Sequence, residues 1–81
     1  MQKKIFINDL DIGLDIKNKL SERDLTVAWL ARQIDFDISN LFKQLNNKHI
    51  YPELLFKISV ALETDFFIAY SEKIKQITQQ K

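Results

Sequence analysis

The 81-residue chain contains no cysteine, one glycine, one proline and one histidine. Without cysteine it can form neither a disulfide nor a thiolate metal site. A single glycine excludes a glycine-rich phosphate loop, and so few turn residues argue against an all-β fold. No apolar run is long enough to span a membrane, and the start MQKKIF lacks the apolar segment of a secretory signal. We therefore expect one cytoplasmic, all-α domain.

Catalytic chemistry has little support in this composition. His49 is the only histidine, and no serine has a paired base in view. Asp35 and Asp37 are explained as a turn residue and a helix N-cap. We expect no enzyme activity, no metal site and no small-molecule cofactor.

The chain is organised around residues 26–46, which read as two short helices joined by a tight turn. Val27, Leu30, Ala31 and Ile34 form one apolar stripe at helical spacing, and that spacing resumes at Leu41 and Leu45. Thr26 and Asp37 are good N-cap residues directly before the two stripes. A helix, a short turn and a second helix make up the helix-turn-helix motif. An ordinary αα-hairpin inside a small bundle would show the same pattern.

The remaining segments complete a five-helix domain. We expect an N-terminal arm at residues 1–11, a domain at 12–77 and a frayed tail at 78–81. A first helix should cover 12–22, a fourth should begin at Pro52, and a fifth should be capped by Asp65. Asn46 and Asn47 tolerate the left-handed conformation that often ends a helix, so we expect the helix at 38–46 to end there in that conformation. The core should centre on Leu30, Ile34, Leu41, Leu55 and Ile58, with Trp29 packed at its edge.

A binding face is expected on the helix at 38–46. Net charge is only +1, but residues 38–51 contain no acidic side chain. With Leu41 and Leu45 turned inward, polar and amide side chains are left on the outer face, where amides can read adenine and lysine can read guanine or hold a phosphate. The candidate DNA-binding residues are Thr26, Ile38, Ser39, Asn40, Lys43, Gln44, Asn46, Asn47 and Lys48.

Five segments carry a family resemblance: IGLDIKNKL, TVAWLARQI, DISNLFKQL, IYPELLFKIS and DFFIAYS. Together they resemble the small bacterial DNA-binding domains of the phage-repressor (lambda Cro/repressor, Xre-type) helix-turn-helix class. The resemblance implies a compact, five-helix lambda-repressor-like domain and a transcriptional regulator that reads the major groove with residues 38–46. It places Ile38, Ser39 and Lys43 in the groove, with Asn40 beside them and Thr26 on the backbone. Asp35 and Asn47 stand where the class commonly has glycine.

A different class of function stays open. The same fold could serve as a protein–protein interaction or regulatory adaptor, which the near-neutral charge and the apolar Ile38 and Phe42 favour. We also expect a homodimer through the fifth helix, because that segment has more apolar surface than a small domain readily buries. The residues expected at that contact are Phe66, Phe67, Ile68 and Tyr70. Alternatively, Phe66 and Phe67 complete the core of the monomer.

Overall fold

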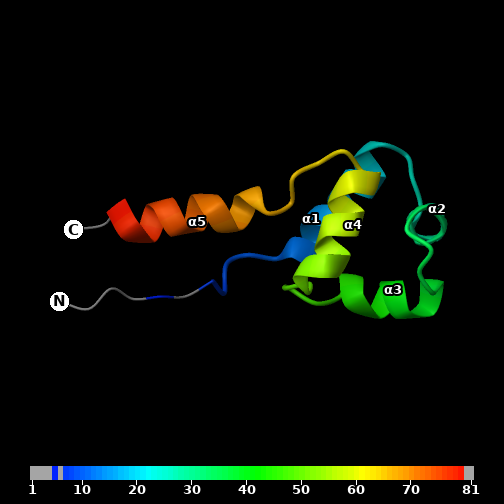
Figure 1. The fold of residues 1–81 in the computed structure, drawn as a ribbon, viewed down its shortest axis with the longest axis horizontal. Helices are drawn as coiled ribbons and strands as arrows, with labels where there is room; N and C mark the ends of the chain where they lie inside the picture. The colour runs from blue at the N-terminus through cyan, green and yellow to red at the C-terminus, as the bar shows by residue number, and fades with distance from the viewer. Residues whose placement is uncertain (1–4, 6, 80–81) are drawn as a thin grey trace.

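The first three helices begin where the sequence provides a capping side chain, and the fourth begins at a proline. The computed structural model describes residues 5 and 7–79, and in these residues every regular element is an α-helix (Figure 1). The helices are α1 Ile12–Glu22, α2 Val27–Gln33, α3 Ile38–Leu45, α4 Pro52–Ala61 and α5 Ile68–Gln79. The side chains of Asp11, Thr26 and Asp37 accept hydrogen bonds from the first turns of α1, α2 and α3, at 3.1, 3.0 and 2.8 Å. The all-α prediction, the bounds of α1 and the start of α4 at Pro52 are confirmed.

Three helices end on an acidic residue in the left-handed conformation. Asp24 after α1, Asp35 after α2 and Glu63 after α4 have φ of 60°, 52° and 48°. In each case the following N–H reaches back to the last turn, as in a Schellman motif. These bonds join Leu25 to Leu20 (2.8 Å), Phe36 to Ala31 (2.9 Å) and Thr64 to Ser59 (3.0 Å). The predicted left-handed end at Asn46 and Asn47 is wrong: Asn46 ends α3 with φ of −84°, and neither residue has positive φ.

The core is built by α1 to α4 and the segments that follow α3 and α4. The main contacts between helices join α3 to α1 and α2, and α2 to α4. Leu30, Leu41, Leu55 and Ile58 are essentially inaccessible to solvent, as predicted, whereas Ile34 is only half-buried because it ends α2. Trp29 packs against the core from a half-buried position. The other buried apolar residues are Ile12, Ile16, Leu20, Ala31, Leu45, Ile50, Leu54, Leu62 and Phe66.

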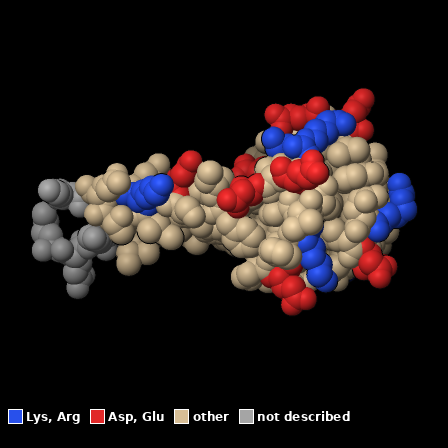
Figure 2. All heavy atoms as spheres, turned by 45° about the horizontal axis from the view of Figure 1, so that its top comes forward, with Lys and Arg blue, Asp and Glu red and all other residues tan. Residues whose placement is uncertain are grey.

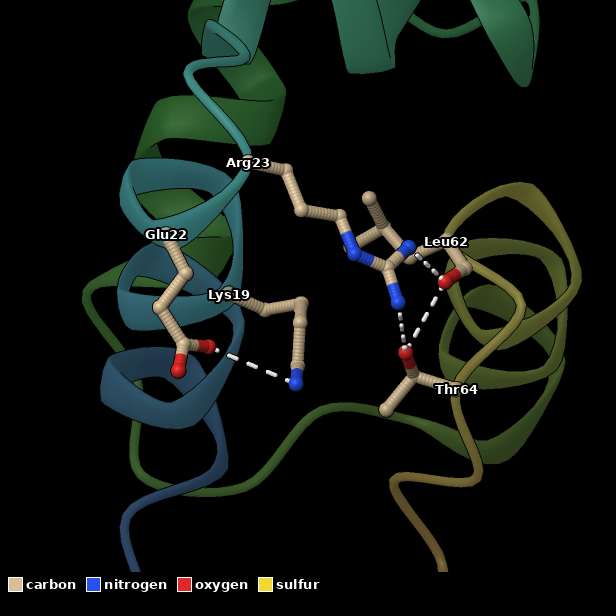
Figure 3. Close-up of polar contacts among 5 residues, drawn as sticks. All are labelled: Lys19, Glu22, Arg23, Leu62 and Thr64. Atoms are coloured by element: carbon tan, nitrogen blue, oxygen red, sulfur yellow. Dashed lines mark hydrogen bonds and ion pairs between the residues drawn. The ribbon is translucent and has the colours of Figure 1, made fainter.

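Arg23 fastens the end of α1 to the end of α4 (Figure 3). Its guanidinium donates to the carbonyl oxygen of Leu62 and to Oγ1 of Thr64, the latter at 3.3 Å. The Thr64 hydroxyl donates to the same Leu62 carbonyl at 2.8 Å. A cation here satisfies carbonyls that the helix leaves without an internal partner, and it meets the negative end of the helix dipole. Arg23, which follows α1, therefore caps the carboxyl end of α4.

The last helix leaves the packed body of the protein. Figure 1 shows α5 beside the described part of the N-terminal arm, projecting from a head made by α1 to α4, and the molecule measures 47 × 21 × 19 Å. We call this projection the stalk, and side-chain contacts hold it. The ammonium of Lys73 lies 2.8 Å from the Asp9 carboxylate, and Nδ1 of His49 lies 2.7 Å from the Tyr70 hydroxyl. None of the described helices is long and apolar enough to cross a membrane.

The fifth helix begins later than predicted. It starts at Ile68, because the Asp65 carboxylate accepts from the N–H of Phe67 at 2.9 Å and closes a turn instead of a helix. Phe66 is only 6% exposed and belongs to the core, so its predicted place in a dimer contact is wrong. At the other end, α5 continues through Gln79, so Thr78 and Gln79 are helical and not part of the predicted frayed tail. Residues 1–4, 6 and 80–81 of the predicted arm and tail lie outside the described residues.

Candidate nucleic-acid interface

The carboxyl end of α3 rests on the start of α1. The N–H of Ile12 donates to the carbonyl of Lys48 at 2.7 Å. A Cβ added to Gly13 would collide with the carbonyl oxygens of Leu45 and Asn47 and would lie 2.9 Å from the carbonyl carbon of Leu45. A free N–H at the start of α1 thus finds a carbonyl partner in the turn that follows α3. This close backbone approach fixes the position of α3.

The amino end of α3 is set by the turn after α2. Asp35 occupies the left-handed position in the turn between α2 and α3, and Phe36 after it packs partly into the core. Asp37 then caps α3. In Figure 1 α2 is seen nearly end-on while α3 runs across the view, so the two helices cross and do not run antiparallel. An αα-hairpin would place them antiparallel.

Most of the predicted site residues share the outer face of α3. Leu41 and Leu45 are buried beneath it. Gln44 is half-buried at the edge, so it is less available than predicted. The exposed members are Ile38 (40%), Ser39, Asn40, Lys43 and Asn46, together with Phe42 (53%). The outer face of α3 therefore combines amide, hydroxyl and cationic groups with two apolar side chains.

Two cations that the sequence did not single out lie at the ends of this face. At the carboxyl end, the ammonium of Lys17 in α1 donates to Oδ1 of Asn46 at 2.9 Å. At the amino end, Arg32 of α2 lines a shallow surface hollow together with Ile38. Lys17 is 29 positions from Asn46 in the sequence, and periodicity within one helix cannot pair residues so far apart. Lys43 is therefore not the sole positive charge at this face.

Three predicted residues lie beside the outer face of α3 and not on it. Lys48 directs its ammonium to the carbonyl of Asn8 in the arm, at 3.2 Å. Asn47 is exposed in the turn after α3. Thr26 is exposed at the start of α2, where its hydroxyl oxygen accepts from the N–H of Trp29. Its hydroxyl hydrogen is left to donate elsewhere.

Charges of both signs surround the candidate face. Asp35 and Asp37 stand at its amino end, and both are exposed. Figure 2 shows Lys and Arg atoms interspersed with Asp and Glu over the head, without a continuous patch of one sign on the face in view. Strong, sequence-independent attraction to a polyanion does not follow from such a surface.

Comparisons of the chain with protein-family models, with curated proteins and with solved structures found no match.

Proposed function

We propose that this protein is a transcription regulator that binds double-stranded DNA through a lambda-repressor-like helix-turn-helix. The observation that carries the proposal is the placement of α3. Its inner face is fixed by Leu41 and Leu45, its carboxyl end is held by α1, and its outer face is open from Ile38 to Asn46. In helix-turn-helix proteins the second helix enters the major groove in this way, while the first crosses the backbone.

Side chains on the face of α3 can supply both kinds of contact that specific binding needs. The amides of Asn40 and Asn46 can read adenine, and Lys43 can read guanine or hold a phosphate. Ile38 and Phe42 can contact thymine methyl groups. Ser39 and Thr26 can donate hydroxyl hydrogens to phosphates, which sets the register of the protein on the duplex.

The charges around α3 set the expected strength of binding. If Lys17, Arg32 and Lys43 each neutralise one phosphate, log K should fall with log salt with a slope of about −3 or shallower per chain. Asp35 and Asp37 oppose that attraction at the amino end of the helix. We therefore propose modest affinity that depends on base contacts and is best seen at low salt. We also propose that the protein is cytoplasmic and binds DNA in that compartment.

The test begins with selection of bound sequences from a random duplex pool. The selected duplex is then titrated at several salt concentrations with the wild type, Lys43→Ala and the control Lys75→Ala, which removes an exposed lysine from the stalk. Lys43→Ala should bind more weakly than both other proteins, because the lost lysine lies on the reading face. Loss of a base contact costs about 1–3 kcal/mol, whereas loss of a phosphate contact lowers the salt slope by about one. Equal binding curves for all three proteins would show that α3 is not the helix that contacts the bases.

A protein-binding adaptor is the second candidate. Ile38 and Phe42 lie one turn apart on α3, and on α4 Phe56 and Val60 repeat that spacing, with each residue 61% exposed. Exposed apolar residues in pairs of this kind favour a partner that buries them. Failure to select any duplex at low salt, with the protein folded, would support this alternative over DNA binding.

A further inference from the structure

A side-chain contact between Lys17 and Asn46 joins α1 to the carboxyl end of α3. The ammonium of Lys17 lies 2.9 Å from Oδ1 of Asn46, and both residues are exposed. Lys17 follows Gly13 by four positions, so the two lie on the same side of α1, where the backbone after Leu45 approaches closely. The contact therefore stands beside a fixed junction between the two helices.

The lysine determines how the amide of Asn46 is turned. An ammonium group has only donors, so the amide atom that faces Lys17 must be the oxygen. The Nδ2 amino group of Asn46 then points away from the lysine. Asn40 differs, because within the part of the chain that the structure describes its side-chain amide has no hydrogen-bond partner and can turn either way. The two asparagines therefore present different groups to a ligand.

This orientation decides what Asn46 can recognise in a major groove. An amide reads adenine by accepting from the N6 amino group and donating to N7, so its oxygen must face the base. An adenine brought to the oxygen of Asn46 would place its amino group beside the Lys17 ammonium, donor against donor. The groups left to a ligand are the Asn46 amino group and the remaining ammonium hydrogens, which are all donors. Guanine matches them, because it presents two acceptors, O6 and N7.

We propose that Lys17 is a positioning residue that makes Asn46 read guanine, whereas Asn40 on the same helix reads adenine. This role rests on the DNA binding proposed for α3 and names the base that one end of the helix selects. A phosphate oxygen is also an acceptor, but a phosphate contact carries no sequence information. Guanine reading therefore has its own signature, a preference at one base pair that depends on both Lys17 and Asn46.

The orientation of the amide can be tested without DNA. In NMR spectra of the free protein, Lys17→Met should shift the side-chain amide resonances of Asn46 and leave those of Asn40 in place. Methionine keeps a long side chain and removes its donors. Lys17→Arg, which keeps donors at this position, should stay close to the wild type. Asn46 resonances that do not respond to Lys17→Met would overturn the proposal even if the protein binds DNA.

Base preference is measured on the duplex selected from a random pool. The base pair read by Asn46 is the one at which Asn46→Ala abolishes discrimination. The wild type should favour guanine over adenine there by about tenfold, the order expected for one good bidentate contact. Lys17→Met should reduce or reverse that ratio, because the freed oxygen can accept from adenine, and Lys17→Arg should retain it. The matched control is the base pair found in the same way with Asn40→Ala, where Lys17→Met should leave the adenine preference unchanged.

The possible outcomes separate guanine reading from DNA binding as such. If no duplex is selected, DNA binding by α3 fails and guanine reading fails with it. If a duplex is selected but Asn46→Ala only lowers the salt slope, the pair holds a phosphate and guanine reading alone is overturned. A guanine preference that survives Lys17→Met would show that Lys17 does not position the amide. Replacing that guanine by 7-deazaguanine, which lacks the N7 acceptor, should weaken binding of the wild type and leave Asn46→Ala unaffected.

Discussion

The Cα of Gly13 lies so close to the carbonyl of Leu45 that no side chain fits between α1 and α3. A Cβ at Gly13 would collide with the carbonyl oxygens of Leu45 and Asn47, which are backbone atoms and cannot rotate away. Gly13→Ala must therefore move α3 away from α1. Overpacking of this kind costs about 1–3 kcal/mol. Urea unfolding should show that loss, whereas the exposed control Asn18→Ala in the same helix should change stability by less than about 0.5 kcal/mol. An unchanged midpoint for Gly13→Ala would contradict the close approach.

Glu63 offers a stabilising substitution. Its φ of 48° is strained for any residue with a Cβ, and its carboxylate stands at the negative end of the α4 dipole. Glycine removes both penalties but loses more entropy on folding, so we expect Glu63→Gly to raise the free energy of unfolding by roughly 0.5–1 kcal/mol. The matched control is Glu72→Gly inside α5, which should lower stability by about 1 kcal/mol if α5 unfolds with the head. Thermal melts measure the stability of both variants. A lower stability of Glu63→Gly than of the wild type would argue against the left-handed conformation of Glu63.

Arg23 should contribute to stability through the hydrogen bonds that close α4. The guanidinium is exposed on one side, so its contribution is expected at about 1 kcal/mol, the low end for a bond to a charged group. Arg23→Ala should lose that amount in chemical denaturation. Arg32→Ala, which removes an exposed arginine from α2, is the control and should lose less. Equal losses would mean that the contacts with Leu62 and Thr64 add nothing.

The contact between Asp9 and Lys73 should respond to acid. The hydrogen bond from Lys73 holds the pKa of the Asp9 carboxyl below its ordinary value of 3.8. Because the pKa of the carboxyl is lower in the folded protein, the contact stabilises the docked arm at pH values above the ordinary pKa. That stabilisation is lost as the pH falls through the folded-state pKa. NMR titration of the Asp9 carboxyl should therefore give a midpoint below 3.8, and Lys73→Met should return it toward the ordinary value. A midpoint that Lys73→Met leaves unchanged would contradict this contact.

Local signals were enough to predict the helices and most of the core. Capping residues and apolar spacing act within one or two turns, so α1, the start of α4 and the burial of Leu55 and Ile58 follow from the sequence. The start of α5 was missed because Asp65 closes a turn with the same side-chain bond that would cap a helix. The intrinsic preference of asparagine predicts a left-handed end at Asn46 and Asn47, but the left-handed residues of the structure are Asp24, Asp35 and Glu63, which no asparagine or glycine marks in the sequence.

The candidate site was predictable only where it lies on one helix. The outward side chains of α3 follow from its period, since Leu41 and Leu45 define the inner face. Lys17 and Arg32 reach that face from other helices, and their positions depend on how α1 and α2 pack on α3. The role of Gly13 was also hidden, because a close backbone approach depends on a partner more than 30 residues away.

The most direct test of DNA reading by α3 is an NMR titration of isotope-labelled protein with the selected duplex. If α3 reads DNA, the largest amide shift changes occur at Ser39, Asn40 and Lys43, with smaller changes at Thr26, Lys17 and Arg32. Changes centred on Phe56 and Val60 of α4, or no change up to millimolar duplex at low salt, would contradict it.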